Sequence, residues 1–197
     1  MAYFFCDSPR WFRGTLCCRY LVVRFGKLRV PMQKEGAPVA ADWHWALGFF
    51  TDGQFEVLGA WQDEGAMTAQ RIAVDLHERG IERVKAVAAE GTVIEAMGGL
   101  RPEVSATTTA ELAESGAFGP RMRRAILWTD AAGLHLQGRM SRVARRQVPF
   151  AGPATAADFI AQAFQRADRD LLRDRRDRKQ PAPFGQRAFV ASRASAA

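Results

Sequence analysis

Apolar and polar residues in the first third of the chain follow the pattern of β-strands. Residues 15–30, TLCCRYLVVRFGKLRV, are rich in β-branched and aromatic residues and predict one or two strands, with a possible turn at Phe25-Gly26-Lys27. Residues 32–42 are polar and interrupted by glycine and proline, which predicts a loop. Two more strand-like runs, 43–51 and 54–61, flank Asp52-Gly53, a dipeptide that supplies the positive φ of a tight turn. The pattern therefore predicts an antiparallel hairpin over 43–61.

The period of the apolar residues then changes to that of a helix over 64–79. Its apolar face is formed by Ala69, Ile72, Ala73 and Leu76, and Gly80 is placed to end it. The short apolar run 83–89 predicts a buried strand, which stops at Glu90-Gly91. Since a helix that links two strands of one sheet is a crossover that makes them parallel, the chain predicts a mixed sheet.

The C-terminal half is less regular. Residues 98–120 read as a connector with one short helical candidate around 110–114. A capping-box-like start at Thr155 to Asp158 opens a helix that runs to about residue 176. Its apolar face is Ile160, Phe164, Ala167 and Leu171. We expect this helix and the 64–79 helix to cover opposite faces of the sheet, within a domain of residues 1–165. Residues 166–197 are expected to form a basic helix end and a flexible tail.

The overall composition is that of an ordinary globular protein, but charge is distributed unevenly along the chain. Residues 1–120 hold 12 Lys/Arg and 15 Asp/Glu, whereas residues 121–197 hold 16 and 6. Within 26 residues Asp130 is the only acid among seven arginines, Arg121, Arg123, Arg124, Arg139, Arg142, Arg145 and Arg146. Guanidinium groups in that excess cannot all be paired locally, so this segment predicts contact with the phosphates of a nucleic acid. The alternatives are an unpartnered solvated surface and the arginine usage of a GC-rich genome.

Other composition features narrow the class of protein. The chain has no run of 18 apolar residues and no secretory-signal pattern, so we expect no membrane partner and a cytoplasmic location. Cys6, Cys17 and Cys18 have no CxxC spacing and are expected to be buried free thiols. The histidines, His44, His77 and His135, have no metal-binding spacing and are expected to be structural. Trp43, Trp45 and Trp61 flank the hairpin and are candidates for one packed cluster.

Four stretches together resemble the catalytic core of the mutator-type insertion-sequence transposases, whose fold is ribonuclease-H-like. They are WALGFFTDGQFEVLGAW (45–61), EGAMTAQRIAVDLHERGIERV (64–84), AAEGTVIEAM (88–97) and RRAILWTDAAGLHLQGRMSRVARRQVPF (123–150). The order and spacing agree over 45–97, and 123–150 is a looser match. The resemblance implies an α/β fold with a mixed sheet flanked by helices.

The resemblance also implies a site of two aspartates and a glutamate that holds two Mg²⁺ ions. Here Glu90 stands at the second aspartate position, and Gly133 stands at the glutamate position with Asp130 and His135 as the nearest substitutes. The first aspartate falls on Cys17 in one register and on Asp7 in another, and the Cys17 register preserves more of the strand pattern. Glu90 and Asp7 are thus the candidate catalytic residues. Glu90 is the only candidate metal ligand. A bound Mg²⁺ ion is expected only if the protein is active.

Two functions remain open from the sequence. One is a reduced transposase-family protein in DNA transposition or recombination that binds DNA, a full-length transposase or itself, with strand transfer lost or very weak. The other is a ribonuclease-H-like scaffold repurposed as a protein-interaction module.

Overall fold

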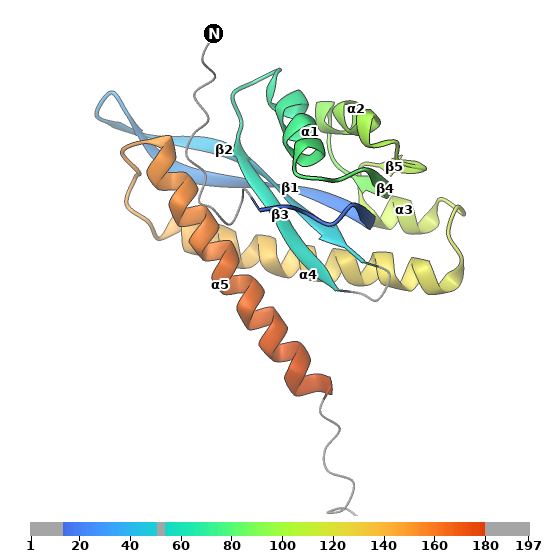
Figure 1. Cartoon of the computed structure of the whole chain (residues 1–197). Coiled ribbons are helices and arrows are strands. Elements are labelled where there is room, and N and C mark those ends of the chain that lie inside the picture. The colour runs from blue at the N-terminus through green and yellow to red at the C-terminus, as the bar shows by residue number, and fades with distance from the viewer. Residues whose placement is uncertain (1–13, 51–53, 180–197) are drawn as a thin grey trace, which may run out of the picture.

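A computed structural model of the chain describes residues 14–50 and 54–179, without the side chains of Arg121 and of residues 168–179. One mixed sheet of five strands forms its centre, in the order β3-β2-β1-β4-β5 (Figure 1). The first three strands are antiparallel neighbours, and β4 and β5 run parallel to β1. The strands are β1 Arg19–Lys34, β2 Ala37–Phe49, β3 Phe55–Gln62, β4 Arg83–Ala88 and β5 Val104–Ala106. The helices are α1 Thr68–Glu78, α2 Thr92–Ala96, η2 Met97–Leu100, α3 Thr109–Glu114, α4 Pro120–Arg145 and α5 Pro153–Lys179.

Helices cover both faces of the sheet, and each face has its own apolar core. On one face α1 buries Ile72 and Leu76 against residues such as Val23 and Leu58. On the other face α4 and α5 lie against the sheet, and α5 buries Ile160 and Phe164 beside Trp45. The prediction of an α/β mixed sheet with these two helices on opposite faces is confirmed, and the strand order is consistent with a ribonuclease-H-like fold.

The hairpin predicted over 43–61 is confirmed as the antiparallel pair β2 and β3. The expectation of one tryptophan cluster there is wrong. Trp43 and Trp45 belong to the core under α5, whereas Trp61 packs on the α1 face and donates its indole N–H to Asp75 at 3.1 Å. The alternation of a strand sends these side chains to opposite sides.

The predicted loop at 32–42 and the possible turn at 25–27 are both wrong. Strands β1 and β2 continue through these residues and meet in a tight turn at Glu35-Gly36, where φ is 53° and 80°. Gly26 lies inside β1. A glycine is required there because the indole ring of Trp45 covers it so closely that a Cβ would clash. The glycine therefore marks a close approach between strands rather than a reversal.

Three smaller expectations also need correction. Helix α5 begins at Pro153, before the capping box that we expected, and the Thr155 hydroxyl donates to the Gly152 carbonyl at 2.8 Å. Cys17 and Cys18 are free but exposed rather than buried. The connector over 98–120 contains the strand β5, which was not expected, and the short helix expected around 110–114 is present as α3. Among the described helices none combines the length and apolarity needed to cross a membrane.

Candidate functional site

Glu90 lies just beyond the carboxyl end of β4, two residues after its last residue Ala88, as the sequence pattern predicted. Gly91 next to it has a φ of 56°, which turns the chain into α2. Strand β1 continues beyond this point, and the open end of β4 leaves a pocket of about 290 Å³ beside β1. The lining includes Arg24, Lys27, His44, Glu90, Val93 and Gln137. Ligands of open α/β sheets bind at such carboxyl ends, so the pocket is the natural candidate for a site.

The side chain of Arg24 extends from β1 to α4 and lines the pocket. In the pairing of β1 with β4, Arg24 lies opposite Ala88, and Ala88 is two residues before Glu90 in the chain. Its side chain is only 14% exposed, its guanidinium lies 3.4 Å from the carboxylate of Asp130, and it lies directly against Gly133. Burial lowers the pKa of Arg24, and the charge of Asp130 opposes that shift. Arg24 was not among the candidate residues from the sequence, although an arginine within the apolar run of a central strand is itself a signal of a special environment.

Asp130 is held between two elements. It accepts a hydrogen bond of 2.6 Å from the hydroxyl of Thr109 at the start of α3, in addition to the ion pair with Arg24. Asp130 thus ties α3 and β1 to α4.

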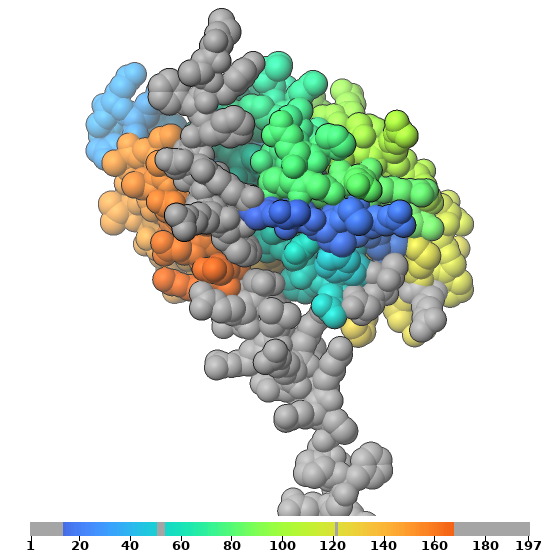
Figure 2. Space-filling view, in the orientation of Figure 1, coloured from blue at the N-terminus to red at the C-terminus, as the bar shows by residue number. Residues whose placement is uncertain are grey.

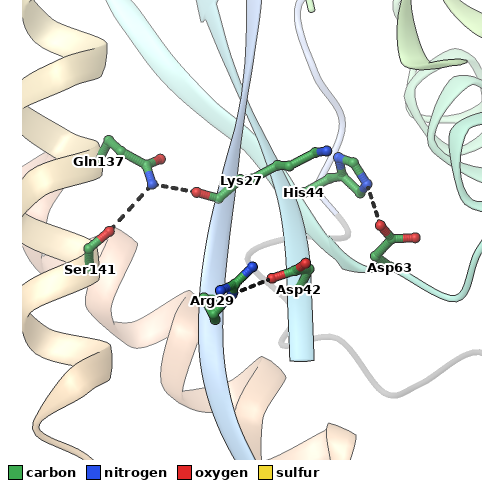
Figure 3. Close-up of polar contacts among 7 residues, drawn as sticks. All are labelled: Lys27, Arg29, Asp42, His44, Asp63, Gln137 and Ser141. Atoms are coloured by element: carbon green, nitrogen blue, oxygen red, sulfur yellow. Dashed lines mark hydrogen bonds and ion pairs between the residues drawn. The ribbon is translucent and has the colours of Figure 1, made fainter. Parts of the chain in front are cut away.

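Gln137 and His44 complete the polar lining of the pocket. The amide of Gln137 accepts a hydrogen bond of 2.7 Å from the Trp45 indole, and its NH₂ group donates to the carbonyl of Lys27. Figure 3 shows this contact, and it shows the side chains of Lys27 and His44 lying together on the side of the sheet away from Gln137. His44 is buried, and its Nε2 lies 3.3 Å from Asp63. The N–H of Gly65 and, after it, His44 lower the pKa of Asp63.

The structure does not bring Cys17 to Glu90. Cys17 precedes β1, and the carbonyl of Cys18 accepts the N–H groups of Glu82 and Arg83 at the opposite end of β4. The strand between them spans about 20 Å. Cys17 is therefore not part of the Glu90 pocket. Asp7, which occupies the first acid position in the other register, lies outside the described residues.

The two substitutes considered for Gly133 are also not available as ligands beside Glu90. Asp130 is engaged by Arg24 and Thr109. His135 is exposed and lies on the opposite side of α4 from Gly133, since two residues rotate a helix by about 200°.

These residues do not fit a pair of Mg²⁺ ions. Such ions require several converging oxygen ligands. Among the described residues no group of three or more His, Cys, Asp or Glu side chains converges on one point. The guanidinium of Arg24, itself a cation, stands between Asp130 and the Glu90 pocket.

The arginines singled out from the sequence all lie on α4 or directly after it. Arg121, Arg123 and Arg124 are in its first turn, and Arg139, Arg142, Arg145 and Arg146 are at its last two turns. A helix of 26 residues is about 39 Å long, so the two groups stand far apart. The ends of α4 accordingly lie at opposite ends of the molecule, and the yellow N-terminal part forms one edge of it in Figure 2.

Most of these arginines are exposed residues. Within residues 14–50 and 54–179, none of the five exposed ones forms an ion pair with a carboxylate; they are Arg123, Arg124, Arg142, Arg145 and Arg146. Arg142 and Arg145 each donate to a carbonyl of their own helix, at 3.2 Å. Arg139 is half-buried. The five exposed arginines thus form two groups of cations, one at each end of α4, without a carboxylate partner in the part of the chain that the structure describes.

No protein-family model and no curated protein matches this chain.

Proposed function

We propose that this protein binds DNA and is related to the transposases that its sequence resembles, with strand transfer lost or very weak. It would act in the cytoplasm on DNA, alone or together with a full-length transposase or a second copy of itself. The observation that carries the proposal is the set of exposed arginines on α4 that have no carboxylate partner among the described residues.

The physical argument for DNA is electrostatic. The net charge of the chain is +7, and its excess of cations lies in the segment that forms α4 and α5. Guanidinium groups bind phosphate with two parallel hydrogen bonds, and binding releases the counterions condensed on DNA. Exposed arginines at both ends of a long helix are well placed to hold phosphates at two separate places along one nucleic acid.

The argument for weak or absent catalysis comes from the Glu90 pocket. Its central cation is Arg24, which cannot ligate a metal, and Glu90 is the only carboxylate among the described residues that line the pocket. If the protein is active, Glu90 is its candidate ligand for Mg²⁺, and Asp7 is the other candidate catalytic residue.

The test is the salt dependence of duplex binding. We expect the logarithm of the binding constant to fall linearly with the logarithm of salt concentration, by about 0.9 for each phosphate neutralised. Four to six contacts correspond to a loss of about two to three powers of ten between about 50 and 200 mM salt. Replacing Arg142, Arg145 and Arg146 together by alanine should reduce the slope by about two to three units.

The matched control replaces exposed arginines elsewhere. Arg71 and Arg83 both lie outside α4 and pair with Glu64 and Glu103, so their joint replacement by alanine should leave the slope unchanged. Binding that is independent of salt, or unchanged in the triple variant, would contradict the proposal and favour the alternative of a protein-interaction module.

A further inference from the structure

The outer face of α4 carries exposed apolar side chains between its two groups of arginines. Leu127, Trp128 and Leu134 are 51%, 65% and 58% exposed. Exposed large apolar side chains gathered on one helix face mark an interaction surface more often than scattered ones do.

A regular row of exposed residues that includes Trp128 runs along the helix beside Leu127 and Leu134. Successive members are three or four residues apart, which places them on one line of an α-helix. In order the row is Arg124, Trp128, Ala131, His135, Gly138 and Arg142, and each of these residues is exposed. The row therefore reads cation, aromatic, small, aromatic, small, cation, over about 27 Å. We call it the α4 row.

From the α4 row we infer that the preferred ligand is an unpaired strand of nucleic acid rather than a duplex. This inference rests on the proposed function, because it uses the same arginines for the phosphates. Bases of a single strand stack on Trp128 and His135, and the arginines at both ends of the row hold the backbone. Stacking on an aromatic side chain is available to every base and is independent of sequence.

The chemistry of the α4 row favours this ligand over two others. In a duplex the faces of the bases are already stacked on each other, so Trp128 would gain no stacking partner. In a two-fold pairing of two copies through this face, either relative direction of the helices sets arginines of one copy against arginines of the other. Like charges in contact oppose such a dimer.

The experiment compares a labelled oligothymidine of about 20 nucleotides with the same strand paired to oligoadenine, at one salt concentration, by fluorescence anisotropy. We expect the single strand to bind more tightly. Trp128→Ala should weaken single-strand binding by about tenfold, equivalent to about 1.4 kcal/mol, and leave duplex binding almost unchanged. Trp128→Phe, which keeps an aromatic face, should retain most of the affinity.

Val74→Ala is the matched control, because Val74 is 47% exposed on α1, on the other face of the sheet. It should change neither affinity. Because Trp128 is exposed, its replacement should leave the fold intact, and circular dichroism of each variant checks this.

The outcomes separate this inference from the proposed function. If Trp128→Ala affects neither ligand while the triple arginine variant still flattens the salt dependence, the inference fails and the proposed function stands. If neither ligand shows salt-dependent binding, both fail. A dimer in sedimentation experiments that Trp128→Ala dissociates would also overturn the inference, since the face would then be covered by a second copy.

Discussion

The guanidinium of Arg24 in β1 fills the space that a side chain at Gly133 of α4 would occupy. The resemblance places an acid at position 133, and the structure places a cation against it. The contact with Asp130 makes the arrangement a link between the central strand and the helix rather than a set of converging carboxylates. The position of the Arg24 side chain therefore requires that residue 133 has no side chain.

We predict that Gly133→Ala destabilises the protein, although alanine is the better helix former. The added Cβ meets Arg24 and forces it away from Asp130, which should cost about 1 kcal/mol or more. Gly138→Ala in the same helix is the matched control: nothing lies within 4 Å of its Cβ, so it should stabilise the protein by about 0.5–1 kcal/mol. Urea unfolding measures both changes.

The same pair gives a check of the cause. In an Arg24→Ala background the space beside position 133 is empty, so Gly133→Ala should become stabilising there. If Gly133→Ala has the same effect with and without Arg24, the contact between the two residues is not what makes glycine necessary.

Tyr20 provides a prediction about ionisation. It is buried, and its hydroxyl donates to Glu56 and accepts the N–H of Cys17 at 3.1 Å. Burial, and after it the Glu56 carboxylate, raise the pKa of Tyr20 well above its usual 10.0. In a Tyr3→Phe variant, Tyr20 is the only tyrosine. Its ultraviolet absorbance should show no tyrosinate on raising the pH until the protein unfolds; ionisation at ordinary pH values in the folded protein would contradict the prediction.

Asp63 predicts a small loss of stability in acid. Its pKa is lowered from 3.8 in the folded state, chiefly by the N–H of Gly65 and then by His44. A lowered pKa means that the unfolded chain binds the proton more tightly, so the stabilisation is complete above about pH 4 and is lost as the pH falls through the folded value. Because the side chain is 33% exposed, the effect should stay below about 1 kcal/mol. Free energies of unfolding between about pH 5 and 2 should fall less steeply in Asp63→Asn; parallel curves for the two proteins would refute this.

The parts of the fold that follow from local chemistry were predictable from the sequence. The 43–61 hairpin depends on Asp52-Gly53 between two strand-like runs, and the faces of α1 and α5 depend on apolar residues at helical spacing. Glu90 at the end of β4 follows from the apolar run before it. Each of these features is decided by residues close to one another in the chain.

The parts that were missed depend on contacts between distant residues. Gly26 looks like a turn residue until Trp45 of the neighbouring strand is seen to cover it. Helix α4 escaped prediction because glycines and arginines obscure its buried positions. These positions nevertheless recur every three or four residues as Ile126, Thr129, Gly133, Leu136, Met140 and Ala144. The ion pair of Arg24 with Asp130 joins β1 to α4. Its two residues are 106 positions apart in the sequence, so no pattern of neighbouring residues predicts that they pair.

The last prediction concerns catalysis. Two-metal cleavage of a phosphodiester needs oxygen ligands on both sides of the metals. Among the described residues, the lining of the Glu90 pocket offers one carboxylate, that of Glu90, and the cations of Arg24 and Lys27. Purified protein incubated with supercoiled DNA or donor-end DNA and Mg²⁺ or Mn²⁺ is therefore expected to produce no nicks and no strand-transfer products. Glu90→Ala should bind DNA as the original protein does, since Glu90 lies apart from the α4 arginines. Nicking that disappears in Glu90→Ala would overturn this prediction, and its loss in Asp7→Ala as well would favour the register that places Asp7 at the first acid position.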